Sequence, residues 1–130
     1  MHKNYLITAA IFGGLAVALG AFGAHGLERV TSDEKILKSF QTGVQYQMYH
    51  ALALMVVSIL YDKLSISWMK WAGMFFIIGI FLFSGSLYLL TFLKIQGSNA
   101  ISMVGPITPL GGVTFIAGWL CLVMAVARKK

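Results

Sequence analysis

The residues best suited to chemistry in this sequence are two histidines, His25 and His50, which lie within or beside long apolar stretches. Tyr46 lies four residues before His50, and Gln45 lies four residues before Tyr49, so each pair shares one face of a helix. A histidine can change charge close to neutral pH, and its ring nitrogens donate and accept hydrogen bonds. These residue types and spacings favour proton exchange or hydrogen bonding to a small polar group.

Enzyme, metal and cofactor chemistry find little support in the sequence. Ser84 and Ser86 carry no sequence signature of an activated nucleophile. The chain has a single cysteine, Cys121, and no His-x-x-x-His or Cys-x-x-Cys pattern that would indicate a zinc or haem site. All of its acids lie outside the long apolar runs: Glu28, Asp33, Glu34 and Asp62. We therefore expect no enzyme activity, no catalytic residue, no metal and no cofactor.

The composition indicates where these residues lie. Of the 130 residues, 58% are hydrophobic and only 11% are charged, whereas roughly 25% are charged in soluble domains. So few charges could not cover a surface that faces water, which indicates a membrane protein. The formal net charge is +6, but the basic residues flank the apolar runs and form no patch. We therefore expect membrane lipids as partners and no nucleic acid.

Four apolar runs are long enough to cross a bilayer, which takes about 20 helical residues. They cover about residues 5–24, 44–61, 71–93 and 105–127. The sequence thus predicts one all-α membrane domain over residues 1–130, an integral bundle of four transmembrane helices. The first run also permits a signal peptide, because Ala21-Phe22-Gly23 offers small residues at cleavage spacing.

Two connecting segments carry helix signals of their own. Thr31 and Glu34 have the spacing of a capping box and precede apolar residues at helical spacing. This pattern predicts a short interfacial helix leading into the second span, with a bend at Gly43. Pro106 and Pro109 predict a helix break, with irregular backbone through Gly112 at the start of the fourth span.

The lysine and arginine residues predict the orientation in the membrane. With four spans, six of them share a side with both termini: Lys3, Lys63, Lys70, Arg128, Lys129 and Lys130. Four lie on the opposite side: Arg29, Lys35, Lys38 and Lys94. The positive-inside rule then places both termini in the cytoplasm, with the protein in a bacterial inner membrane.

Most polar residues of the four spans fall in the half of the membrane away from the termini. The candidate polar cluster comprises His25, Gln45, Tyr46, Tyr49, His50, Ser84, Ser86, Tyr88 and Thr108. Polar and ionisable groups inside a membrane are functional candidates by default. A purely structural role stays open, because His50 and His25 could serve only to bond neighbouring helices or sit at the interface.

Small residues predict where helices approach each other closely. The first span has pairs of small residues one turn apart, a spacing typical of membrane helix packing. The predicted packing residues are Gly13, Ala16, Gly20, Gly23 and Gly85. Trp119 lies in the middle of the fourth span and is predicted to be a core residue.

Four stretches in a fixed order carry a family resemblance over nearly the whole chain. They read GAFGAHGL at 20–27, FQTGVQYQMYHALAL at 40–54, FSGSLY at 83–88, and ITPLGG at 107–112 followed by Gly118-Trp119. This pattern resembles the small bacterial membrane family called domain of unknown function 423, and it is similar to the eukaryotic transmembrane protein 256. The resemblance implies an integral membrane protein of about four helices and supplies no reaction.

Two functional hypotheses follow. In the first, a non-enzymatic membrane protein uses the polar cluster to bind or pass a small solute, a proton or a lipid headgroup. Because four helices enclose little room, a sizeable cavity would form more easily in a homo-oligomer. In the second, the protein is a structural or accessory subunit whose Gly/Ala face packs against a membrane-protein partner, and the cluster only bonds helices together.

Overall fold

The computed structural model describes residues 1–129, and every regular element in that range is helical. The elements are α1 (Lys3–His25), the 3₁₀ helix η1 (Leu27–Arg29), α2 (Glu34–Leu60), α3 (Ile66–Gly79), the π-helix η2 (Ile80–Gly85), α4 (Ser86–Gln96), α5 (Ile101–Val104) and α6 (Ile107–Ala127). Since α3, η2 and α4 follow one another without a gap, the described chain has four helical segments long and apolar enough to cross a membrane. The predicted all-α fold with four membrane helices is confirmed.

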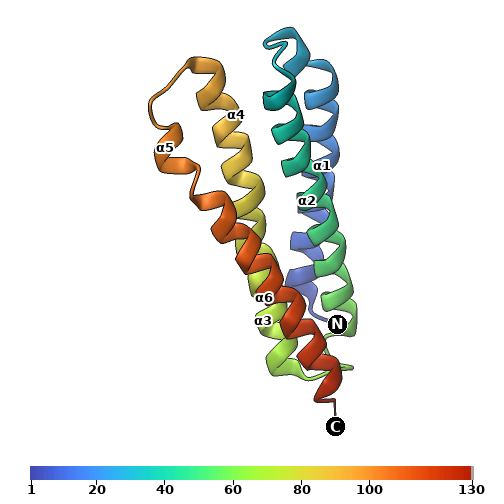
Figure 1. Cartoon of the computed structure of the whole chain (residues 1–130). Coiled ribbons are helices and arrows are strands. Elements are labelled where there is room, and N and C mark those ends of the chain that lie inside the picture. Colours follow the sequence, from blue (N-terminus) through green and yellow to red (C-terminus); the bar gives the residue numbers. More distant parts are fainter. Residues whose placement is uncertain (130) are drawn as a thin grey trace.

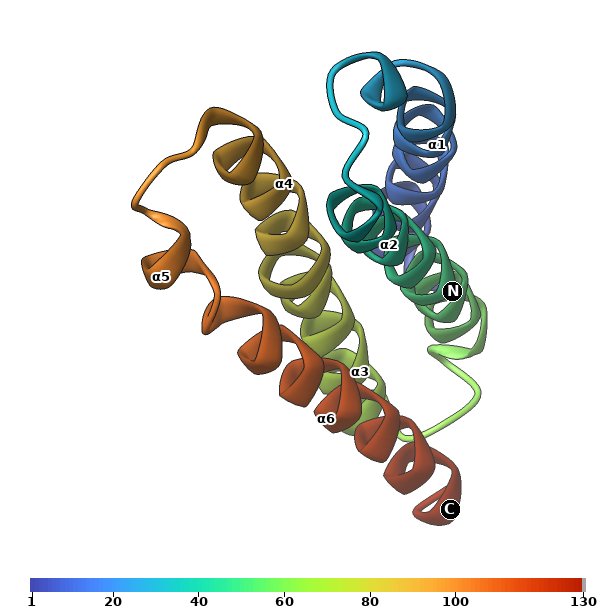
Figure 2. The ribbon, with the colours of Figure 1, turned by 45° about the horizontal axis from the view of Figure 1, so that its top comes forward.

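The helices form two antiparallel pairs. α1 packs along α2, and the continuous α3–η2–α4 segment packs along α6. Figures 1 and 2 show that the pairs lie close together where both chain termini are found and diverge toward the opposite end. We call the first the terminal end. We call the second the loop end, which carries the connections at residues 26–33 and 97–100.

Between the α3–η2–α4 segment and α6, glycines on each side make room for phenylalanines from the other. Three such pairs follow one another along the interface: Phe83 with Gly111, Phe115 with Gly79, and Phe76 with Gly118. A Cβ atom on Gly118 would lie 2.7 Å from the Phe76 ring, and one on Gly111 would collide with the backbone of Phe83. This close fit suits a membrane, where van der Waals packing replaces the hydrophobic effect between helices.

The start of α2 differs from the prediction. α2 begins at Glu34 and continues through Gly43, so the segment predicted as a separate interfacial helix forms the first turns of one 27-residue helix without a break. Its N-cap is Asp33, whose side chain accepts a hydrogen bond from the amide two residues on, so the predicted capping by Thr31 is wrong. Gly43 serves packing, because a Cβ atom there would lie 2.9 Å from the Tyr88 ring.

The proline segment is also more regular than predicted. α5 ends just before Gly105 and Pro106, and α6 already begins at Ile107. Pro109 therefore lies in the first turn of α6, where a backbone N–H would have no acceptor within the helix. The break is confined to the two residues before α6, and the predicted irregular backbone from Ile107 through Gly112 is wrong.

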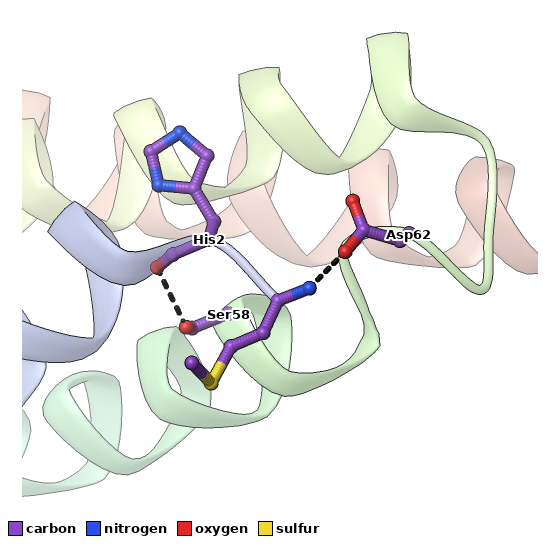
Figure 3. Close-up of polar contacts among 4 residues, drawn as sticks. His2, Ser58 and Asp62 are labelled. Carbon is purple, nitrogen blue, oxygen red and sulfur yellow. Dashed lines mark hydrogen bonds and ion pairs between the residues drawn. The ribbon is translucent and has the colours of Figure 1, made fainter.

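At the terminal end, the first residues of the chain contact the end of α2 and the segment that follows it. The His2 amide donates to the Ser58 carbonyl at 2.9 Å. The Ser58 hydroxyl donates to the His2 carbonyl at 2.8 Å, as Figure 3 shows. The Met1 amino group forms an ion pair with Asp62. Tyr5 stacks on the His2 ring and donates its hydroxyl to a carbonyl of α3 at 2.9 Å. We call these contacts the terminal clasp.

Candidate functional site

His50 is buried among aromatic rings between α2, α3 and α6. Its Nδ1 lies 2.7 Å from the Tyr46 carbonyl oxygen, and its Nε2 lies 3.1 Å from Trp119 Nε1. Because an indole nitrogen only donates, Nε2 is the unprotonated nitrogen and Nδ1–H donates to the carbonyl. The ring stacks on Phe115 with centroids 3.5 Å apart. Trp119 itself is 44% exposed, so its predicted core position is wrong.

Gln47 lies outside the predicted cluster, yet it joins three helices. Its amide nitrogen donates to the Phe12 carbonyl of α1 at 2.8 Å, and its amide oxygen accepts from the Tyr88 hydroxyl of α4 at 2.7 Å. Its position relative to two other interior residues of the same helix could have predicted this role from the sequence. Gln47 lies four residues after Gly43 and three before His50, and all three positions face the interior of the bundle.

Ser84 and Ser86 bond to helices on opposite sides of their own segment. Ser84 Oγ donates to the Gly43 carbonyl of α2 at 2.6 Å, whereas Ser86 Oγ lies 2.5 Å from Thr108 Oγ1 of α6. Side chains two residues apart point in roughly opposite directions around a helix, so the Ser-Gly-Ser sequence reaches both neighbours. Together with the bonds above, these contacts form what we call the interior network: Gln47, His50, Ser84, Ser86, Tyr88, Thr108 and Trp119.

Four members of the predicted cluster lie outside the interior network. The side chains of His25, Gln45 and Tyr49 are exposed, and none forms a hydrogen bond with another described residue. The fourth, Tyr46, is 39% exposed and packs its ring on Phe83, with centroids 4.6 Å apart. The structure therefore brings together part of the cluster and leaves the rest on the surface.

The predicted packing residues divide in the same way. Three of them lie where α1 packs on α2: Ala16, Gly20 and Gly23. A Cβ atom on Gly13 would have no described atom outside its own helix within 4 Å, and one on Gly85 would meet only a carbonyl of its own segment. Neither glycine is explained by packing within the described chain.

A pocket of about 320 Å³ opens at the loop end between α1 and α2. The amides of Gln41 and Gln45 line it one helical turn apart on α2, and Glu28 of η1 adds a carboxylate. None of these three side chains forms a hydrogen bond or ion pair with another described residue. We call this the loop-end pocket, and its lining residues are Gly20, Gly23, Ala24, Glu28, Leu37, Phe40, Gln41, Val44 and Gln45.

The interior network and the loop-end pocket offer different chemistry. Among the described residues, no buried side-chain nitrogen or oxygen lacks a hydrogen-bond partner, so the network has no free polar group to offer a ligand. The pocket keeps one carboxylate and two amides available to an outside donor or acceptor. Its volume of about 320 Å³ reaches the lower end of the range for ligand pockets, roughly 300–1,000 Å³. The arrangement can therefore hold a small polar group.

A family model described as "Protein of unknown function (DUF423)" matches residues 19–112. The chain belongs to this family. The UPF0382 membrane protein YwdK of Bacillus subtilis is 52% identical over 127 residues, which cover 97% of this DUF423 chain and 98% of that protein. The UPF0382 inner membrane protein YgdD of Escherichia coli is 38% identical over 125 residues, covering 96% and 90%.

The relatives extend beyond bacteria. A UPF0382 membrane protein of Schizosaccharomyces pombe is 40% identical to the DUF423 chain over 118 residues, covering 89% of this chain and 95% of that protein. These names describe membrane proteins and give no activity. No solved structure matches the chain. The predicted resemblance is confirmed, and the matched residues 19–112 include the whole loop-end pocket.

Proposed function

We propose that this DUF423 protein is a non-enzymatic membrane protein that binds an amine-bearing lipid headgroup in the loop-end pocket. The observation that supports it is the set of unengaged polar side chains, Glu28, Gln41 and Gln45, around a cavity otherwise lined by small and apolar residues. A primary ammonium carries three N–H donors, which one carboxylate and two amide oxygens can accept. The amide N–H groups of the two glutamines can donate to the neighbouring phosphate.

The rest of the pocket suits the part of a lipid that follows its headgroup. Leu37, Phe40 and Val44 line it on the α2 side, and Gly20 lines it on the α1 side. The pocket therefore combines polar groups with an apolar wall at the end of two apolar helices. Such a combination favours an amphiphile over a fully soluble ligand.

The interior of the bundle supports binding more than passage. Both ring nitrogens of His50 are engaged, by Tyr46 and by Trp119, and aromatic rings pack around it. A proton or solute that used His50 as a relay would have to break one of these two bonds first. The loop-end pocket requires no such rearrangement.

The proposal is tested by measuring which lipid stays with the protein. Purified protein in nanodiscs is offered phosphatidylethanolamine or phosphatidylcholine, and retained lipid is counted by native mass spectrometry. We expect phosphatidylethanolamine to be retained in preference, because the choline group has no N–H donor. Gln41→Leu combined with Gln45→Leu should abolish the preference, whereas Gln96→Leu, at the same end but outside the pocket, should keep it.

Two further comparisons sharpen this test. Ala24→Phe fills the pocket, whereas Ala21→Phe places the same ring on an exposed position outside it. Only the first should lower phosphatidylethanolamine retention. Equal retention of both lipids by the unmodified protein would contradict the proposal. Displacement by free phosphoethanolamine at equal concentration would assign the pocket to a soluble amine and overturn the lipid assignment.

A second candidate, an accessory subunit, is favoured by the exposure of α1. In the most apolar 18-residue stretch of the Lys3–Arg29 segment, only 11% of the residues are buried. In the corresponding stretches of the other three membrane segments, 28% to 44% are buried. Ala16 and Gly20 already pack against α2, so replacing either of them with a large residue such as leucine would disturb the chain itself. Gly14 is exposed and contacts nothing outside its helix, so Gly14→Leu should remove a co-purifying membrane protein while the α1–α2 pair stays intact.

We also infer that both termini lie in the cytoplasm and that the protein resides in a bacterial inner membrane, as the six-to-four excess of basic residues on the terminal side supports. Ser32→Cys at the loop end and Ser67→Cys at the terminal end provide exposed labelling positions, while Cys121 is buried. A membrane-impermeant thiol reagent added to spheroplasts should label only the first. Labelling of only the second would invert the orientation.

A further inference from the structure

A second pocket, of about 410 Å³, lies at the surface of the terminal end. It is formed by the connection between α2 and α3, the first residue of α3 and the residues that follow α6. Three basic side chains line it, and Asp62 is the acid among its lining residues. We call it the basic pocket, and its lining residues are Asp62, Lys63, Leu64, Ser65, Ile66, Arg128 and Lys129.

The charge of the basic pocket is positive and uncompensated. Asp62 already forms an ion pair with the Met1 amino group in the terminal clasp. Lys63, Arg128 and Lys129 form no ion pair with a described residue, so three positive charges face one acid that is engaged elsewhere. Such an arrangement attracts an anion, and a guanidinium can bind two oxygens of one phosphate side by side.

The surroundings of the pocket place it at the level of lipid headgroups. The Arg128 guanidinium lies over the Trp68 ring, 5.7 Å from its centroid, which holds the arginine beside the pocket. Tryptophan is enriched where a membrane protein meets the boundary between lipid and water. Leu64 and Ile66 add apolar surface to the same pocket. The pocket thus joins cations to an apolar wall at the edge of the bundle.

We propose that the basic pocket binds the phosphate of an anionic phospholipid, with Arg128 and the two lysines on the phosphate oxygens and the two apolar side chains against the glycerol and first acyl carbons. The site is separate from the loop-end pocket, lies at the opposite end of the molecule and takes the opposite charge. Its failure would therefore leave the amine-headgroup proposal untouched.

The test compares variants with equal loss of charge at the same end of the molecule. Lys63→Gln with Lys129→Gln removes two cations from the pocket, whereas Lys3→Gln with Lys70→Gln removes two exposed cations outside it. Each protein in phosphatidylcholine nanodiscs is titrated with phosphatidylglycerol, and bound lipid is counted by native mass spectrometry. We expect the pocket pair to weaken phosphatidylglycerol binding about fivefold per lysine, and the control pair to weaken it by about twofold at most.

A third variant and a second probe make the outcome decisive. Arg128→Lys keeps the charge but removes paired oxygen binding and the guanidinium over Trp68, so it should weaken binding severalfold. Equal losses in the two lysine pairs, or no loss in Arg128→Lys, would show diffuse attraction and overturn the proposal. Inorganic phosphate that competes as strongly as phosphatidylglycerol would assign the pocket to a free anion and overturn the lipid assignment.

Discussion

The terminal end and the loop end are built from the same four helical segments, yet they are held together in opposite ways. At the terminal end, Tyr5 packs directly on Gly73 and is bonded to the Lys70 carbonyl, while His2 and Ser58 exchange two hydrogen bonds. At the loop end the helix pairs diverge (Figure 2), and pockets of about 320 and 370 Å³ open beside α1. Between the helices, the terminal end is closed by contacts and the loop end is left open, while the basic pocket lies on the surface of the terminal end.

Within the bundle, this difference separates the contacts that stabilise the helices from the space at the loop end that is available to a ligand, whereas the basic pocket lies on the surface of the terminal end. Within the terminal clasp, and separately within the interior network, polar side chains form hydrogen bonds to neighbouring helices or segments. Satisfied polar networks of this kind make a region rigid. Regions that bind ligands are generally drawn from the less stable parts of a protein. The loop end, with Glu28, Gln41 and Gln45 unengaged, fits that description. We therefore expect substitutions at the two ends to affect different properties.

The largest expected contrast is between two glycines of the bundle. A Cβ atom on Gly73 would collide with the Tyr5 ring, which is fixed by stacking and a hydrogen bond, whereas one on Gly20 would lie 3.3 Å from a methyl of the half-buried Val44. Gly73→Ala should lower the free energy of unfolding by about 2–3 kcal/mol, the upper part of the usual range for overpacking, because the ring cannot easily move away. Gly20→Ala should change it by less than about 1 kcal/mol.

Reversible unfolding in detergent micelles, followed by tryptophan fluorescence, measures both values. Similar losses for Gly73→Ala and Gly20→Ala would break the contrast between the two ends. Losses only in the second variant would reverse it.

The next largest effect is expected between the ends, where Gln47 joins α1, α2 and α4. Gln47→Leu should lower the free energy of unfolding by about 1–2 kcal/mol, because it removes the acceptor of the Tyr88 hydroxyl and the side-chain hydrogen bond to the Phe12 carbonyl. A double-mutant cycle with Tyr88→Phe should give a coupling energy of about 0.6 kcal/mol or more. The exposed Gln45→Leu is the matched control and should leave stability unchanged. An equal loss of stability in Gln45→Leu would contradict the prediction, because the hydrogen bonds of Gln47 would then not account for the effect.

The sequence predicted the number and type of the helices because apolar length and helical periodicity are local properties. It also predicted His50 as a polar residue inside the bundle. It could not predict that Trp119, 69 residues away, would donate to His50, because that bond depends on how α2 and α6 pack. The capping by Asp33 was missed for a local reason: Thr31 and Asp33 are both good caps, and only the observed helix start decides between them.

Glycines illustrate the same limit more sharply. The small-residue spacing in α1 predicted contact at Gly20 and Gly23, which the structure shows, but it also included Gly13, which contacts nothing outside its helix. Gly79 and Gly111 were not predicted, although each is close against a phenylalanine or its backbone. A glycine's role depends on the ring that faces it from another helix, and no spacing within its own helix supplies that information.

A smaller effect is expected from the terminal clasp itself. Ser58 is fully buried, and its hydroxyl donates to the His2 carbonyl at 2.8 Å, so Ser58→Ala should lower the free energy of unfolding by about 1 kcal/mol. Ser67→Ala, on an exposed position near the same end, should leave it unchanged. The same micelle unfolding experiment measures both. If Ser58→Ala left the free energy of unfolding unchanged, as its control should, the terminal clasp would not contribute to the stability of the terminal end.

The smallest effect is expected on the outer face of α1, which takes no part in holding either end. Gly14 is exposed, and a Cβ atom there would have no described atom outside its helix within 4 Å. Gly14→Ala should therefore raise the free energy of unfolding by about 0.5–1 kcal/mol, the difference in helix propensity alone. Unfolding of the purified protein at two concentrations measures it. If Gly14→Ala instead lowered the free energy of unfolding, and did so more at the higher protein concentration, this face of α1 would pack against another copy of the chain. Association between copies would then stabilise the protein in addition to the contacts at the terminal end.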